Sequence, residues 1–257
     1  MIKEIIDYFE FEGNKIEVKS IIDESNKLTP IIFLHEGLGS VSLWKSWPKK
    51  VSLTLKRNVY VYSRLGMGNS SPLIGKRNVN YMHDEAKNVL PNLIDYLGIK
   101  SPILIGHSDG ASIALIYAGS GFQVEAIILE APHVFVEELS IKGVINAKKM
   151  WNNSNLKEKL SKHHKDVDGA FNGWSDAWIS EEFKNWNIEK YLKHINIPTM
   201  LIQGYDDKYG TMRQLDSISS QIKYNPLRLE IKNCGHSPHI EYPQLVLDNI
   251  QQFINSY

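Results

Sequence analysis

Near its middle the chain reads Pro102-Ile103-Leu104-Ile105-Gly106-His107-Ser108-Asp109-Gly110. A short apolar run comes first and a helical pattern begins at Asp109, so Ser108 stands between a buried strand and a helix. The Gly-x-Ser-x-Gly pattern predicts a sharp turn here, because side chains two residues before and after the serine would collide. Such a turn strains the serine backbone and exposes its hydroxyl above a helix N-terminus, which favours developing negative charge. We therefore expect Ser108 to be a nucleophile.

Five other short apolar runs are spread along the chain, at residues 30–34, 59–62, 126–129, 198–204 and 227–231. Runs of this kind are typical of strands covered on both faces, as in a parallel sheet. Helical patterns lie between them, at residues 84–97, 109–118 and 243–254. The first 22 residues, with Gly13-Asn14 in the middle, indicate an antiparallel hairpin at one edge. The alternation predicts an α/β fold with a mostly parallel sheet of about eight strands and helices on both faces.

Residues 134–195 interrupt this alternation, because no convincing strand occurs there. The segment holds four of the six tryptophans, which are Trp151, Trp174, Trp178 and Trp186. We interpret it as a helical cap inserted into a core formed by residues 1–133 and 196–257. In an alternative interpretation, the tryptophans only anchor the insertion to the core.

A serine nucleophile needs a base, and His236 is the best placed of the nine histidines. It follows the last predicted strand and precedes the last helix, where a loop is free to reach over the sheet. His239 is three residues further on and is a possible decoy. His163 and His164 lie in a charged stretch and are expected to be solvated. The histidines expected to pack or hydrogen-bond at strand ends are His35, His107 and His133.

The base in turn needs a carboxylate that fixes its tautomer. Asp206 and Asp207 both follow the apolar run that ends at residue 204, at the sheet edge where active sites of parallel sheets form. The chain order is then serine, aspartate, histidine. Composition gives no basis for choosing between the two aspartates as the acid that orients His236. Glu130 is the next candidate for this acid.

An oxyanion would need backbone N–H donors. The turn His35-Glu36-Gly37-Leu38-Gly39 directly follows an apolar run and can supply one. The N–H of Asp109 would supply the other. A plain tight turn is the alternative interpretation of the same residues.

Together these motifs resemble the α/β-hydrolase family, in its capped branch of bacterial esterases, lactonases and carbon–carbon bond hydrolases. The resemblance runs from about Ile31 to the C-terminus. It includes Tyr62-Ser63-Arg64-Leu65-Gly66-Met67-Gly68-Asn69-Ser70, which is similar to the family's Arg-Gly-x-Gly-x-Ser stretch. The family's Gly-x-x-Asp motif selects Asp207 over Asp206.

The sequence departs from the family pattern at two places. Glu36 stands where the family's His-Gly-x-x-Gly has glycine, and Leu65 is inserted before Gly66. A carboxylate facing an oxyanion would oppose catalysis, so we expect Glu36 to point away, with Arg64 as a possible partner. Gly37 is the expected first oxyanion donor, and the N–H of Leu38 is the alternative.

Composition excludes several other classes of function. Lys plus Arg and Asp plus Glu are both 29, without a basic cluster, which argues against nucleic-acid binding. Acidic residues interrupt the apolar stretch at the N-terminus, so we do not expect a signal peptide. The sequence has no run of about 18 apolar residues, so we do not expect a membrane span. The single cysteine rules out an intramolecular disulfide and fits a cytoplasmic location. We expect no cofactor, no metal, and a small-molecule substrate.

The expected reaction is hydrolysis of a carboxylic ester or related acyl group through an acyl-enzyme. Cleavage of a carbon–carbon bond in a dienone or β-diketone would use much the same residues, and so would acyl transfer to an alcohol or thiol. A non-catalytic receptor could keep the fold. The presence of serine, acid, histidine and both glycines argues against that alternative.

Overall fold

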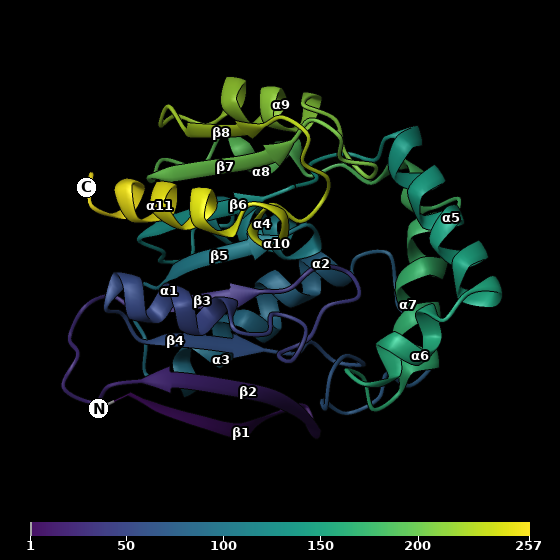
Figure 1. Cartoon of the computed structure of the whole chain (residues 1–257), viewed down its shortest axis with the longest axis horizontal. Coiled ribbons are helices and arrows are strands. Elements are labelled where there is room, and N and C mark those ends of the chain that lie inside the picture. Colours follow the sequence, from purple (N-terminus) through teal and green to yellow (C-terminus); the bar gives the residue numbers. More distant parts are fainter. Residues whose placement is uncertain (1) are drawn as a thin grey trace.

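The computed structural model describes residues 2–257, and its centre is an eight-stranded sheet with the order β1-β2-β4-β3-β5-β6-β7-β8 (Figure 1). The strands are β1 Lys3–Phe11, β2 Asn14–Ile22, β3 Ile31–Leu34, β4 Val59–Tyr62, β5 Ile103–His107, β6 Ala126–Glu130, β7 Thr199–Gly204 and β8 Leu227–Ile231. The pairs β1–β2 and β2–β4 are antiparallel, and the other five pairs are parallel. The predicted α/β fold with a mostly parallel sheet and an N-terminal hairpin is confirmed. The hairpin turn lies one residue earlier than expected, at Glu12-Gly13, where both φ angles are positive.

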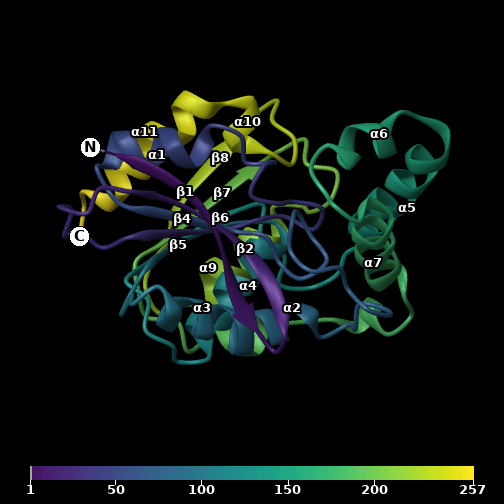
Figure 2. The ribbon, with the colours of Figure 1, turned by 90° about the horizontal axis from the view of Figure 1, so that it is seen from below.

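Alternate residues of the central strands feed two separate apolar cores, one on each face of the sheet (Figure 2). In β3 and β5, Ile31, Phe33, Ile103 and Ile105 point to one face, where they meet helices α1 (Trp47–Leu55) and α11 (Pro243–Ile254). The intervening residues meet α3 (Leu90–Tyr96), α4 (Asp109–Gly119) and α9 (Arg213–Gln221) on the other face. Burial on both faces explains why these strands read as continuous apolar runs.

The helix expected at residues 84–97 is divided into three parts. It consists of α2 (Tyr81–Asp84), a π-helical turn η1 (Glu85–Val89) and α3. Pro91 has no N–H to donate to the carbonyl of Lys87, so regular α-helical bonding is interrupted at this point. The helices expected at residues 109–118 and 243–254 agree with α4 and α11 to within one residue.

Residues 134–195 are helical, as expected from the missing strand pattern. The elements are α5 Glu138–Asn153, α6 Leu156–Ser161, α7 Val167–Ile179, the short 3₁₀ helix η2 Phe183–Asn185, and α8 Glu189–Leu192. The two ends of the segment are joined by an isolated β-bridge between Phe135 and Asn187. Figure 1 shows α5, α6 and α7 beyond the arrowheads of the parallel strands, at the edge where β5, β6 and β7 end. A last short helix, α10 (Pro238–Glu241), lies between β8 and α11.

Candidate active site

Ser108 occupies the tight turn between β5 and α4. Its φ of 54° and ψ of −118° lie in a region that side-chain-bearing residues rarely adopt. A β-carbon on Gly106 would lie 2.5 Å from the Gly110 carbonyl oxygen, and one on Gly110 would lie 2.0 Å from the Leu34 carbonyl oxygen. Both glycines are therefore required by close backbone approach, as the motif predicted.

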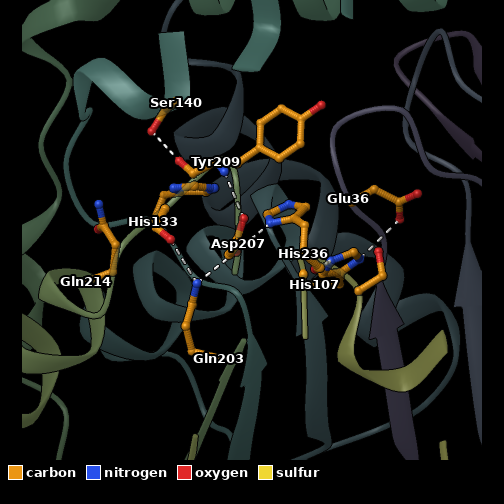
Figure 3. Close-up of polar contacts among 12 residues, drawn as sticks. Glu36, His107, His133, Ser140, Gln203, Asp207, Tyr209, Gln214 and His236 are labelled. Carbon is orange, nitrogen blue, oxygen red and sulfur yellow. Dashed lines mark hydrogen bonds and ion pairs between the residues drawn. The ribbon is translucent and has the colours of Figure 1, made fainter. Parts of the chain in front are cut away.

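His236, in the loop between β8 and α10, lies against a carboxylate that follows β7. Its Nδ1 is 2.8 Å from Asp207 Oδ2 (Figure 3). Asp207 also accepts hydrogen bonds from the Gln203 side chain at 2.7 Å and from the Tyr209 backbone N–H at 2.8 Å. Burial alone would raise the pKa of Asp207, but the interaction with His236 holds it below its usual value. The neighbouring Asp206 is exposed, so the geometry separates the two aspartates.

Ser108 and His236 line the same cavity, although no hydrogen bond joins their side chains. Within residues 2–257, neither Ser108 Oγ nor His236 Nε2 has another hydrogen-bond partner. Bonds of this kind are often long without substrate and tighten when it binds. Both groups are therefore free to react with a molecule in the cavity.

Three residues that line this cavity have backbone N–H groups without an acceptor in the described part of the chain. A turn closed by the bond from Gly39 N to the Glu36 carbonyl oxygen, 3.0 Å, leaves the N–H groups of Gly37 and Leu38 unpaired. The N–H of Asp109, in the first turn of α4, is also unpaired. All three residues line the cavity with Ser108. The expected donor Gly37 and its alternative Leu38 are thus both available.

Arg64 connects the turn after β3, which carries the N–H groups of Gly37 and Leu38, with Asp109 at the start of α4. Its buried guanidinium donates to the carbonyl oxygens of His35 at 2.6 Å and Glu36 at 2.8 Å, and lies 3.7 Å from Asp109 Oδ2. The expected pairing of Arg64 with the Glu36 carboxylate is therefore wrong. Arg64 is held in the interior by the Asp109 carboxylate and by backbone oxygens, including that of Glu36 itself.

The Glu36 carboxylate instead faces His107, with 3.6 Å between Oε2 and Nδ1 (Figure 3). The other ring nitrogen of His107 lies 2.7 Å from the backbone oxygen of His236 and donates to it. Burial alone would lower the pKa of His107, but Glu36 outweighs this and raises it to about 9. His107 therefore offsets the charge of Glu36 and supports the loop that carries His236.

Two further histidines have partners that the sequence did not indicate. His239 Nδ1 lies 2.9 Å from Glu130 Oε2, and both side chains are buried, so Glu130 pairs with His239 and not with His236. His164 was expected to be solvated, but it is 5% exposed. It accepts from Gly68 N at 3.0 Å and donates to the Leu38 carbonyl oxygen at 2.9 Å. The insertion folds onto the turn that follows β3, and this contact buries His164.

The cavity above Ser108 has a volume of about 120 Å³ and an apolar lining. The insertion contributes Ser140 and Val144 from α5, and Trp174 and Trp178 from α7. Burial, reinforced by His236, lowers the pKa of the lining residue His133 to about 4, which leaves its ring neutral near pH 7. His133 was expected at a strand end near the site, but sequence patterns gave no reason to place Ser140, Val144 or Tyr209 here. The approach of Ser140 and Val144 depends on how the insertion folds back.

Residues 2–257 contain neither a candidate metal site nor a candidate membrane span. No group of three or more histidine, cysteine, aspartate or glutamate side chains is placed to hold a metal ion. None of the helices in this range combines the length and the apolar character needed to cross a membrane.

Comparison with known proteins defines the class. The sequence profile of the family described as "alpha/beta hydrolase fold" matches residues 29–172, which is more than half of the chain. The chain therefore belongs to the α/β-hydrolase family.

Individual relatives are more distant. The chain is 32% identical to human (lyso)-N-acylphosphatidylethanolamine lipase over 105 residues, which cover 41% of this chain and only 30% of that protein. It is 27% identical to putative esterase/lipase 2 of Mycoplasma genitalium over 88% of both chains. Among solved structures, a bacterial membrane phospholipase A superposes with a TM-score of 0.79 at 20% identity, covering 99% of this chain and 86% of that one. The last similarity shows the fold alone.

Proposed function

We propose that the chain is a serine hydrolase that cleaves a small carboxylic ester or related acyl substrate through an acyl-enzyme. One observation carries this proposal. The strained Ser108 shares a cavity with His236, whose Nδ1 lies 2.8 Å from Asp207, and with unpaired N–H groups on two walls. Nucleophile, base, orienting acid and oxyanion donors are the components that acyl transfer requires.

In the proposed mechanism, His236 Nε2 accepts the proton of Ser108 as Oγ attacks the substrate carbonyl carbon. The N–H groups of Gly37 and Asp109 stabilise the oxyanion, with Leu38 as the alternative to Gly37. His236 then protonates the departing alcohol, and an acyl-enzyme remains. A water molecule activated by His236 releases the carboxylic acid and restores Ser108. Asp207 fixes the tautomer of His236 throughout.

The acidic groups near the oxyanion are each compensated, which supports this mechanism. Asp109 Oδ2 accepts the Tyr81 hydroxyl at 2.5 Å and lies 3.7 Å from Arg64. Glu36 faces His107. Two carboxylates beside a developing negative charge would otherwise oppose it.

We further propose that residues 134–195 form a cap that sets substrate selectivity over a core of residues 1–133 and 196–257. Trp174 and Trp178 line the cavity, which supports this role. The other two tryptophans of the segment pack within it, since Trp151 stacks on Phe171 and Trp186 on Phe183, with centroids 4.0 and 5.3 Å apart. That pair supports the packing of the segment and does not line the cavity.

Labelling with a fluorophosphonate, followed by assay on a panel of p-nitrophenyl esters, lactones and dienones, tests the proposal. Ser108→Ala should abolish labelling and lower kcat by several orders of magnitude with the fold intact. Ser112→Ala is the matched control, because Ser112 lies one turn further along α4 and its hydroxyl binds the His133 carbonyl oxygen. Retention of more than about a tenth of wild-type kcat by Ser108→Ala would rule out Ser108 as the nucleophile.

A further inference from the structure

Trp174 presents a hydrogen-bond donor to the cavity that nothing in residues 2–257 accepts. Trp174 is only 8% exposed, and its indole N–H makes no hydrogen bond to any residue in 2–257. Trp178, one turn further along α7, differs because its N–H donates to the Tyr81 hydroxyl at 3.1 Å. An indole N–H only donates, and buried donors are normally paired. The Trp174 N–H is therefore available to donate to a molecule bound in the cavity that Trp174 lines.

The position of this donor is fixed by the turn that follows β3. A β-carbon placed on Gly37 would lie 2.1 Å from Trp174 Nε1, so the indole edge is packed directly against the Gly37 backbone. Gly37 is the proposed donor to the oxyanion. A substrate whose carbonyl oxygen binds the Gly37 N–H would therefore lie beside the edge of the indole ring that carries Nε1.

The charges around the cavity favour an uncharged acceptor. The carboxylates of the lining residues Glu36 and Asp109 are already opposite His107 and Arg64, so neither of these cations is free to pair with an acyl group that carries its own carboxylate. His133 is 1% exposed and its ring is neutral near pH 7, so it offers no positive charge. The Ser140 hydroxyl already donates to the Tyr209 carbonyl oxygen at 2.5 Å.

The volume limits the size of the acyl group. A cavity of about 150 Å³ in another protein holds one benzene molecule. The cavity above Ser108 is about 120 Å³, so it accommodates an acyl chain of roughly six non-hydrogen atoms or fewer.

We propose that the substrate carries a short, uncharged acyl group with an ether, keto or hydroxyl oxygen close to the scissile carbonyl, and that this oxygen accepts the Trp174 indole N–H. The inference rests on the proposed function, because it names the substrate class of the same site. It makes Trp174 a specificity-determining residue.

The first test compares two isosteric substrates, p-nitrophenyl methoxyacetate and p-nitrophenyl butyrate, which differ by an ether oxygen in place of a methylene. Trp174→Phe removes the donor and keeps an aromatic ring. Relative to wild type, it should lower the ratio of kcat/KM for methoxyacetate to that for butyrate about tenfold. The difference in intrinsic reactivity cancels, because the same two esters are compared in both proteins. An unchanged ratio would overturn the inference.

Trp178→Phe is the matched control, since it shortens a neighbouring lining side chain whose N–H is already bound to Tyr81. It should change the kcat/KM of both esters by a similar factor. A selective loss for methoxyacetate in this variant, as large as in Trp174→Phe, would assign the effect to cavity shape and overturn the role of the N–H.

A binding measurement separates the failure of this inference from failure of the proposed function. In Ser108→Ala protein with ¹⁵N-labelled indoles, the resonance that Trp174→Phe abolishes should move downfield on addition of methyl methoxyacetate and not of methyl butyrate. Equal responses to both esters, with Ser108 of the wild type labelled by fluorophosphonate, would overturn only the inference. A selective response with no labelling of Ser108 would support the ligand class and overturn only the hydrolase mechanism.

Discussion

Asp206 and Asp207 are neighbours in the sequence but have different environments. Asp207 is 7% exposed, and its two oxygens accept from His236, Gln203 and the Tyr209 backbone. The Asp206 side chain is exposed to solvent. Because consecutive residues after a strand point in different directions, only one of the two reaches the loop that carries His236.

Asparagine substitutions at the two positions should therefore have unequal effects. Asp207→Asn removes the carboxylate that fixes the His236 tautomer, and we expect kcat to fall by about 10⁴. Asp206→Asn, the matched control, should stay within about twofold of wild type, as surface substitutions usually do. The measurement is steady-state hydrolysis of a p-nitrophenyl ester, with circular dichroism to verify folding. Mild and equal losses would point to a different acid, and Glu130 would be examined next.

The sequence predicted which residues meet at the candidate site better than it predicted the contacts that surround them. Ser108, His236 and Asp207 follow from a local motif and from their positions after predicted strands. The contacts of Arg64 and His164 do not, because they join side chains to backbone oxygens 29 and 126 residues away. No local pattern encodes such contacts, so Arg64 was given the wrong partner and His164 the wrong environment.

At the scale of elements, continuous apolar runs predicted the central strands because these strands are covered on both faces. The hairpin of β1 and β2 was predicted from its turn residues instead. Periodicity predicted helices less well where a proline interrupts them, as between α2 and α3. The insertion was identified by the absence of a strand pattern, but its packing was not predictable. The faces of α5 and α7 that point to the cavity are defined only by contact with the rest of the molecule.

The proposed cap makes a prediction about acyl chain length. Val144 of α5 is 1% exposed and lines the cavity, so Val144→Ala should enlarge it by about two methyl groups. We expect the ratio of kcat/KM for p-nitrophenyl hexanoate to that for the acetate to rise by about three- to tenfold, because added methylenes gain contacts there. Kinetics on a homologous ester series measures this ratio.

Ile145→Ala provides the control for this helix. Ile145 is 40% exposed and is not among the cavity-lining residues, so its truncation should leave chain-length preference unchanged. If Val144→Ala lowered activity on all esters equally, in step with a lower Tm, α5 would be acting only through packing and its role in selectivity would be disproved.

For the whole molecule, several buried charges gather at the carboxyl edge of the sheet. Three carboxylate–histidine pairs meet there, formed by Asp207 with His236, Glu130 with His239 and Glu36 with His107. Burying charge is unfavourable even when the charge is paired, so these pairs are weak evidence for added stability. They link fold stability to pH through groups that surround the candidate site.

His107 gives the clearest case of this linkage. Its pKa is raised from 6.5 to about 9 by Glu36, against the opposing effect of burial. Below pH 6.5 the folded and unfolded states both hold the proton, and the contribution to stability is complete. As the pH rises toward 9, the unfolded chain releases a proton that the folded state still holds, so the contribution is lost. We expect the free energy of unfolding to fall by at most about 3 kcal/mol across this range.

Urea unfolding of wild type and His107→Gln, at several pH values from 6.5 to 9, measures this loss. The glutamine amide can still donate to the His236 backbone oxygen but does not titrate, so the variant should show a smaller decrease with pH. Burial raises the pKa of Cys234 to about 12, so this thiol also makes the free energy of unfolding fall as the pH rises. Cys234 is present in both proteins, so its contribution cancels when their pH dependences are compared. His133 is neutral in both states over most of this range, since its pKa is lowered to about 4 when folded. Parallel pH dependences of the two proteins would show that His107 is not protonated in the folded state and that Glu36 is balanced by another group.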